Sequence, residues 1–302
     1  VLPVIFAPPF PFTGGTQLPV TTDDVWSAPF TLPFNFCFYG VNYPTVNVGS
    51  NGVITFNTQA ANSNCPWAFT QTIPNPGFPI RNAIYGVYQD INPAVDTAPI
   101  LRSINYQILG EAPCRAFVVN YYNIAQFSCN LTAPLQTSQI VLYETSNIIE
   151  VYVQDRVSCT TWNSGSGVIG LQNNEGTIAH FPPDRNTGQW EAHNEAWRFT
   201  PDGNSIVEFS WLKDGAFYSS EPTINVCVSE DTNMTAQAIY TGCGGQTTTK
   251  TENVLLNVTD QILEPIENVV ACQSYTLPAL TIGNYFSQTG GIGPIGPTIT
   301  TQ

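Results

Sequence analysis

The stretch NFCFYGVNYPTVNVGSNGVITFN, residues 35–57, decides the fold class of this 302-residue chain. Every second residue from Phe34 to Phe38 is a phenylalanine, which places these rings on one face of a strand. Two further runs, 45–49 and 53–56, flank Asn51-Gly52, a pair that accepts the positive φ angles of a type I′ turn. The stretch therefore predicts a strand followed by a β-hairpin.

The rest of the chain continues this pattern. Its apolar residues alternate or form short runs, and 23 Gly and 24 Pro interrupt them, so helical signals are almost absent. Strands are predicted at 82–88, 104–109, 116–124, 138–144, 148–154 and 167–173. Strands of this length and spacing predict an all-β protein that begins with a sandwich of antiparallel sheets.

Three units are predicted along the chain. The first, 1–203, opens with an apolar arm, Val1 to Phe12, whose prolines favour an extended segment packed on a neighbour. It closes with a last strand and a Pro-Asp-Gly turn in NEAWRFTPDG, 194–203. The second, 204–260, has the length and alternation of a small immunoglobulin-like β-sandwich. The third, 261–302, reads as the start of a further β repeat, so we expect the polypeptide to continue.

The charge balance narrows the classes of partner. Eight Lys and Arg residues face 22 Asp and Glu residues, which gives a net charge of −14 at pH 7. Such a chain repels phosphate groups and anionic lipids, so nucleic acid and membrane surfaces are not expected as partners. No apolar run reaches the roughly 20 residues that span a bilayer. We expect an exported protein whose signal peptide has been removed and which does not insert into a membrane.

The cysteines predict disulfides rather than a metal site. Eight of them, at positions 37, 65, 114, 129, 159, 227, 243 and 272, lack the spacing of zinc ligands, and disulfides indicate an oxidising compartment. Cys227 and Cys243 flank a predicted strand pair and are expected to form a bridge that stabilises the module by about 2 to 4 kcal/mol. The pairing of the first five cysteines stays open. If Cys272 pairs further along the chain, one of these five is left free or pairs across modules.

The sequence contains no recognised catalytic motif. It has no GxSxG elbow, no HExxH and no phosphate-binding glycine loop. His180 and His193 lie in loop-like segments and are expected to be surface polar residues. Asp23 and Asp24 are expected to form a turn rather than an acid pair. We predict a protein that is not an enzyme, and the alternative that stays open is an exported hydrolase with an unusual site.

One loop carries a candidate metal site. Asp90, Asn92 and Asp96 in YQDINPAVDT are alternate oxygen donors after an apolar strand, a pattern that can hold calcium. The alternation stops early, and no glutamate follows at the spacing of a helix-loop-helix site. The alternative is that Asp90 and Asn92 cap the turn around Pro93.

Tryptophans in the later loops offer a different kind of site. Trp162, Trp190 and Trp197 could stack on sugar faces, which makes a glycan-binding module the alternative function. The competing interpretation is that these rings fill the core of the sandwich.

Six segments of the first unit carry a resemblance: LPFNFCFYGVNYPTVNVGSNGVITFN, AIYGVYQDINP, APCRAFVVNYYNI, TSQIVLYETSNIIEVYVQ, VIGLQNNEGT and NTGQWEAHNEAWRFTP. Together they resemble the N-terminal module of very large surface adhesins of gliding and related Bacteroidota. Their order is also similar to the nidogen-like domain of matrix and adhesion proteins, over roughly residues 20–200. FSWLKDG with CVSEDTNMTAQAIYTGC resembles the immunoglobulin-like unit that follows this module, and CQSYTLPALTIGNYFSQTGG is similar to the stalk repeats of such adhesins.

The resemblance implies export by the type IX secretion system and a type B sorting domain, which these 302 residues do not contain. It implies partners among the secretion and surface-attachment components, with surface glycans as further ligands, and it carries over no catalytic residue and no cofactor. Asp96-Thr97-Ala98 matches the pattern on which this phylum O-glycosylates exported proteins, so Thr97 is a candidate acceptor. We therefore predict a non-catalytic extracellular module of a cell-surface adhesin that acts in attachment or gliding motility.

Overall fold

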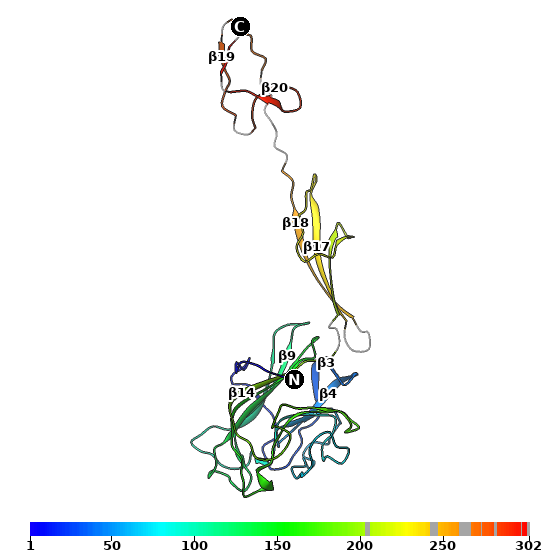
Figure 1. The fold of residues 1–302 in the computed structure, drawn as a ribbon, viewed down its shortest axis with the longest axis vertical. Coiled ribbons are helices and arrows are strands. Elements are labelled where there is room, and N and C mark those ends of the chain that lie inside the picture. The colour runs from blue at the N-terminus through cyan, green and yellow to red at the C-terminus, as the bar shows by residue number, and fades with distance from the viewer. Residues whose placement is uncertain are drawn as a thin grey trace.

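The computed structural model describes residues 1–202, 206–241, 247–259, 267–272, 274–280, 283–296 and 298–300. Figure 1 shows three parts in succession along the long axis, with the N terminus in the largest part and the C terminus at the far end. Apart from one 3₁₀ turn, η1 (Asn163–Gly165), the regular elements of the described residues are all strands. The predicted all-β class is confirmed.

The largest part is a sandwich of two antiparallel sheets. The eight-stranded sheet has the order β1-β14-β11-β10-β9-β8-β2, and β7 pairs with β9. Its strands are β1 (Leu2–Pro3), β2 (Thr16–Gln17), β7 (Ile91–Asn92), β8 (Ser103–Leu109), β9 (Ala116–Gln126), β10 (Gln136–Tyr143), β11 (Ile149–Arg156) and β14 (Ala192–Phe199). The six-stranded sheet has the order β13-β12-β6-β5-β4-β3. Its strands are β3 (Phe30–Phe38), β4 (Val41–Gly49), β5 (Val53–Thr55), β6 (Ala83–Tyr88), β12 (Val168–Gln172) and β13 (Ala179–His180).

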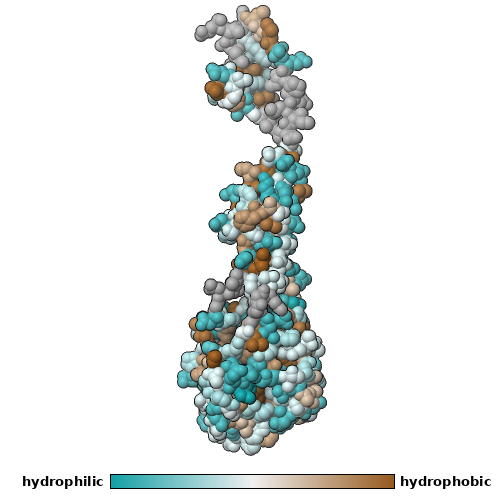
Figure 2. All heavy atoms as spheres, turned by 90° about the vertical axis from the view of Figure 1, so that its right-hand side faces the viewer, coloured by the Kyte–Doolittle hydropathy of each residue, from teal (hydrophilic) through white to brown (hydrophobic). Residues whose placement is uncertain are grey.

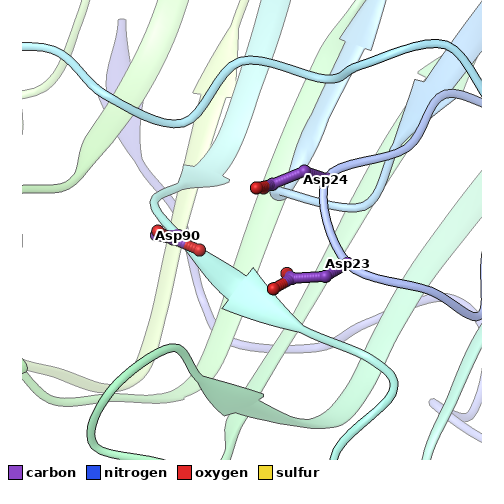
Figure 3. Close-up of side chains that lie close together, drawn as sticks. All are labelled: Asp23, Asp24 and Asp90. Atoms are coloured by element: carbon purple, nitrogen blue, oxygen red, sulfur yellow. The ribbon is translucent and has the colours of Figure 1, made fainter.

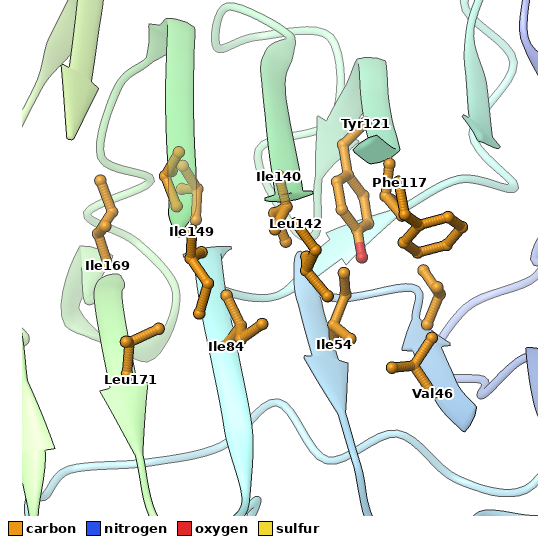
Figure 4. Close-up of a cluster of buried hydrophobic side chains, with 14 of the residues drawn as sticks. Val46, Ile54, Ile84, Phe117, Tyr121, Ile140, Leu142, Ile149, Ile169 and Leu171 are labelled. Atoms are coloured by element: carbon orange, nitrogen blue, oxygen red, sulfur yellow. The ribbon is translucent and has the colours of Figure 1, made fainter. Parts of the chain in front are cut away.

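The main core lies between the two sheets. In β3 the buried residues alternate from Leu32 to Phe38, as the spacing of the phenylalanines predicts. Figure 4 shows side chains of both sheets meeting across this core, and Tyr121 of β9 is one of them. Its hydroxyl donates hydrogen bonds to the carbonyls of Gly49 (3.0 Å) and Val53 (3.2 Å), which ties the sheets together at the hairpin. Burial of each phenylalanine of β3 in this core contributes about 1.5 to 3 kcal/mol to the stability of the fold.

The hairpin between β4 and β5 differs from the predicted turn. Gly49 pairs with Val53, so three residues form the connection, and Gly52 alone among them has a positive φ, of 77°. A type I′ turn would need a positive φ at Asn51 as well, so that prediction is wrong. Close packing fixes the conformation, because a Cβ atom on Gly52 would lie 2.1 Å from the carbonyl oxygen of Val87.

The N-terminal arm packs on its own domain. Leu2 and Pro3 pair with β14 at one end of the eight-stranded sheet. Further along, the carbonyls of Phe10, Pro11 and Phe12 accept hydrogen bonds from the amides of Gln139, Asn120 and Asn105, respectively. Phe6 and Phe10 also pack on a small apolar cluster formed by Ala116, Val118, Val141, Tyr152 and Ala196. The neighbour on which the arm packs is the sheet of the same chain.

Two smaller parts follow the sandwich. The second contains one four-stranded antiparallel sheet in the order β16-β15-β17-β18. This sheet lies in the region predicted to be immunoglobulin-like. Its strands are β15 (Ile206–Lys213), β16 (Ala216–Ser219), β17 (Thr232–Thr241) and β18 (Thr247–Leu256). The third has two strand pairs, β19 (Ser274–Thr276) with β22 (Thr298–Thr300) and β20 (Phe286–Gln288) with β21 (Ile292–Pro294). The predicted boundaries, after 203 and after 260, involve residues 203–205 and 260–266, which lie outside the described residues.

A disulfide in the sandwich joins Cys129 to Cys159, across a sequence separation of 30 residues. The predicted disulfide between Cys227 and Cys243 is not formed at Cys227, which is exposed and has a free thiol. Cys243 lies outside the described residues. The sequence pattern implied a strand pair between these cysteines, whereas β17 runs without a turn from Thr232 to Thr241.

Candidate functional site

Three carboxylates lie together at one end of the sandwich. Asp23 and Asp24 occupy the turn before the segment that contacts β4, and Asp90 follows β6. One oxygen atom from each lies within 4.8 Å of the others, and Figure 3 shows the three side chains directed toward one another. The predicted turn at Asp23-Asp24 is confirmed. The grouping of its carboxylates with Asp90, here called the carboxylate cluster, was missed by the sequence analysis.

The hairpin connection holds the first segment of the cluster in place. The hydroxyl of Ser50 accepts a 3.0 Å hydrogen bond from the amide of Val25, and the Ser50 amide donates to the Val25 carbonyl at 2.9 Å. Asn51, which is fully buried, donates from Nδ2 to Asp24 Oδ1 at 2.9 Å and to the Cys65 carbonyl at 3.1 Å. These bonds fix the turn that carries Asp23 and Asp24.

The same asparagine also fixes the backbone on both sides of Asp90. The Asn51 carbonyl accepts from the amide of Gln89 at 3.3 Å, and Asn51 Oδ1 accepts from the amide of Ile91 at 3.1 Å. One side chain therefore positions two segments that are distant in the sequence. The SNG stretch at the tip of the hairpin predicted a turn, and the structure gives it the further role of organising the carboxylate cluster.

Aromatic residues cover the cluster. The indole Nε1 of Trp162 donates to Asp90 Oδ2 at 2.7 Å, and the Trp162 ring packs between those of Trp67 and Phe127, with centroids at 5.2 and 4.8 Å. The disulfide at Cys129 and Cys159 joins the loops that carry Phe127 and Trp162. A small pocket lined by Asp90, Phe127 and Trp162 opens there.

The electrostatics of the cluster are unusual for surface carboxylates. Burial and the neighbouring charge of Asp24 raise the pKa of Asp23 to about 6. Burial raises the pKa of Asp90 to about 7, with further contributions from the charges of Asp24 and Asp23. Burial also raises the pKa of Asp24. None of the ion pairs within the described residues includes these three, so no protein cation neutralises them there.

The predicted ligand set of Asp90, Asn92 and Asp96 is not brought together. Asn92 lies beside the cluster, where its Nδ2 donates to Asp23 Oδ2 at 2.9 Å while its Oδ1 caps the amide of Ala94. Asp96 points away with a side chain that is 81% exposed, and it pairs with Arg102. The chain turns after Asn92, because the Val95 amide bonds to the Asn92 carbonyl, so alternate positions do not stay on one side.

The three predicted sugar-stacking tryptophans have separate roles. Trp190 is buried between the guanidinium groups of Arg156 (3.9 Å) and Arg185 (4.8 Å), and its indole nitrogen donates to Gly167. Trp197 packs against the core and donates to Glu195. Trp162, half-buried, is the one that reaches the carboxylate cluster. Trp190 is therefore a core residue, and the three rings do not form one exposed platform.

The remaining sequence candidates lie apart from the cluster. Thr97 is buried, and its hydroxyl donates to the carbonyl of Ile100 at 2.7 Å, so glycosylation at Thr97 stays a prediction that would require this loop to open. His180 and His193 are exposed, as expected; His180 stacks on Tyr39, and Nδ1 of His193 lies 2.8 Å from Asp155.

A wider pocket opens beside β8. Its volume is about 370 Å³, and the described residues that line it include Asp96, Ile100, Leu101 and Arg102 but no aromatic residue. It lacks the stacking surface that a sugar would use, and it holds neither the carboxylate cluster nor the predicted tryptophans.

The family to which the chain belongs follows from a match over most of the sandwich and beyond it. The family described as NIDO related matches residues 6–211, from the N-terminal arm into β15. The chain belongs to the NIDO-related family. The nidogen-like module predicted for the first unit is thereby confirmed. No curated protein matches the chain, and no solved structure does.

The NIDO-related domain bears on where the protein is located. This family assignment and the Cys129–Cys159 disulfide indicate an extracellular protein. Among the described residues, no helix has the length and apolar character needed to cross a bilayer. The carboxylate cluster lies inside the matched region, so it belongs to the NIDO-related domain of this chain.

Proposed function

We propose that this chain is a non-catalytic adhesion module of a large secreted cell-surface protein, acting in surface attachment or gliding motility. The observation that carries the proposal is the assignment of the sandwich to the NIDO-related family, which supports an extracellular module. The serial arrangement of the sandwich and two small β parts in Figure 1 supports a role in holding a domain away from an attachment point.

The surface chemistry supports a protein that works outside the cell. On the face shown in Figure 2, hydrophilic and neutral residues cover most of the sandwich, and hydrophobic residues form small separate areas. With 22 acidic and 8 basic residues, the chain would bind neutral or cationic surfaces more readily than phosphate-rich ones. Type IX secretion and attachment components are the partners proposed for export and anchoring.

The proposal is tested on cells of the native source. An antibody against residues 1–202 should label intact cells, its antigen-binding fragments should reduce attachment or spreading, and the intact protein should have a mass far above the 32.9 kDa of these residues. A protein of about 32.9 kDa found only in the medium would contradict the adhesin. Turnover of glycoside or peptide substrates by the purified chain would contradict the non-catalytic part of the proposal.

A glycan-binding module is the alternative, and the pair formed by Trp67 and Trp162 favours it. Both rings are half-buried and 5.2 Å apart, so an exposed part of this pair could stack on a sugar face. Binding on a glycan array that is lost in Trp67→Ala and retained in Trp197→Ala would support this function. Absence of binding to every glycan would count against it.

A further inference from the structure

We propose that the carboxylate cluster binds one calcium ion, held by Asp23, Asp24 and Asp90. Two observations carry this inference beyond the adhesion function. One oxygen from each carboxylate lies within 4.8 Å of the others, a spacing that lets all three reach one ion. Asp90 is 6% exposed, and its buried Oδ1 has no hydrogen-bond partner within the described residues although it belongs to this cluster.

The hydrogen bonds around the cluster have a common pattern. Each carboxylate has one oxygen held by a neutral N–H donor from another segment: Asp23 Oδ2 by Asn92, Asp24 Oδ1 by Asn51 and Asp90 Oδ2 by Trp162. The second oxygens of Asp23 and Asp90 are buried and unpaired. Donors of this kind orient metal-binding carboxylates while the other oxygen remains available to the ion.

The charge of the site favours the binding of a cation. The donors that hold the cluster are amides and indoles, so they fix its geometry without neutralising it. Within the described residues, the arginines that form ion pairs do so with Asp96, Glu144, Glu150 and Glu195 rather than with the cluster. Three partly buried carboxylates without a counter-charge either take up protons or bind a metal ion.

The donor set selects a hard divalent cation, and calcium fits it better than magnesium. No histidine or cysteine of the described residues belongs to the group, so its ligand atoms are oxygens. Calcium takes about 6 to 8 oxygens in irregular geometry, whereas magnesium demands a near-ideal octahedron. Two adjacent residues of one turn and a third from another segment form an irregular set, and water would complete the coordination.

Terbium luminescence tests the site directly, because terbium binds oxygen sites much as calcium does and is excited through nearby indoles. Trp162 is hydrogen-bonded to Asp90 and its ring packs on that of Trp67, so the full chain should show tryptophan-sensitised terbium emission that calcium displaces. Asp90→Asn and Asp23→Asn should lose the emission at least tenfold. Asp96→Asn is the matched control, since its carboxylate is exposed and outside the cluster, and it should retain the emission.

Thermal unfolding distinguishes a lost site from a damaged fold. With free calcium at 100 times its Kd, the melting temperature of the sandwich should rise by about 5 to 10 °C over that in chelator. In chelator, Asp90→Asn should melt no lower than the wild type, because it removes a buried charge, whereas in calcium it should melt lower. A variant that had merely failed to pack would melt lower under both conditions.

Three results would overturn the assignment. Equal melting in calcium, magnesium and chelator, without sensitised terbium emission, would mean that the cluster holds protons instead of an ion. Emission that survives both Asp90→Asn and Asp23→Asn would place the ion elsewhere. A larger shift with magnesium than with calcium would replace calcium by magnesium at this site.

Discussion

The indole nitrogen of Trp162 donates a 2.7 Å hydrogen bond to Oδ2 of Asp90, and this contact joins the loop after β11 to the end of β6. It explains why a tryptophan in a Gly- and Ser-rich loop is only half-exposed. It also gives the buried Asp90 its one side-chain donor within the described residues, so the two residues depend on each other.

Replacing this donor should destabilise the sandwich. Trp162→Phe keeps a ring but removes the hydrogen bond, which leaves both Asp90 oxygens unpaired and should lower the free energy of unfolding by about 1 to 3 kcal/mol. Urea unfolding in chelator at pH 8, where Asp90 is ionised, measures this loss. Trp197→Phe is the control, because Glu195 keeps its ion pair with Arg185, and an equal loss in both variants would contradict the prediction.

Replacing Asn51 should lower the stability of the sandwich more than its small side chain would suggest. Asn51→Ala removes the bonds to Asp24, the Cys65 carbonyl and the Ile91 amide, so three segments lose their common support. We expect a loss of about 2 to 4 kcal/mol in the free energy of unfolding, since buried partners are left unsatisfied. Asn174→Ala, at an exposed position where the side chain bonds only to Asn57 and Glu175 at the surface, should cost under about 1 kcal/mol. Comparable losses would argue against the special role of Asn51.

Two glycines with nearly the same φ separate backbone strain from close packing. Gly52 has a φ of 77° and lies against the Val87 carbonyl, whereas Gly188 has a φ of 76° and no atom lies within 4 Å of the place that a Cβ atom would occupy. Gly188→Ala should therefore cost about 1 to 2 kcal/mol from strain alone. Gly52→Ala should cost at least twice as much, and its melting temperature should fall further. Equal shifts would mean that the hairpin yields easily at Val87.

Without a bound metal, the stability of the sandwich should fall as pH rises. The pKa of Asp23 is raised to about 6 and that of Asp90 to about 7 from 3.8, and that of Asp24 is also raised, so folding takes up protons. The contribution of these three carboxyl groups to the free energy of unfolding is fully present below about pH 4, where they are protonated. It is lost as the pH rises through about 6 and 7. Melting curves in chelator from pH 5 to about pH 8 should show this decrease, and Asp90→Asn should flatten it. An unchanged slope in Asp90→Asn, equal to that of Asp96→Asn, would contradict it.

Reduction of the disulfide should loosen the cover of the cluster. Opening the Cys129–Cys159 bridge, with its separation of 30 residues, should lower the free energy of unfolding by about 3 to 4 kcal/mol. Because the bridge joins the loops of Phe127 and Trp162, hydrogen exchange at those loops should rise as well. Cys114→Ser, which changes an exposed free cysteine, should leave both measurements unchanged.

The sequence contains local patterns but not contacts between distant segments. The phenylalanines of β3 alternate because one face of that strand is buried, and this is readable from spacing alone. The hairpin can be predicted from the sequence too. Its turn type depends on how close Gly52 comes to Val87, which no local pattern reveals. The all-β class and the nidogen-like module could therefore be predicted, and the conformation of the connection could not.

The candidate site was predictable only in part for the same reason. The sequence pattern includes Asp90, but its partners Asp23 and Asp24 come from a distant turn that Asn51 and Asn92 hold beside it. The alternate spacing of Asn92 and Asp96 pointed to the wrong third residue, because the chain turns after Asn92. Similarly, no sequence pattern shows that Trp190 lies between two arginines.

The N-terminal arm has a consequence for how copies of this domain behave when crowded together. The outermost position of the eight-stranded sheet belongs to Leu2 and Pro3, a strand of two residues of which one has no amide hydrogen to offer. A long open edge at β14 would instead invite strand exchange between molecules and, with it, aggregation. By covering the part of that edge from Ala196 to Arg198, the arm shortens the surface through which neighbouring domains could join into one continuous sheet.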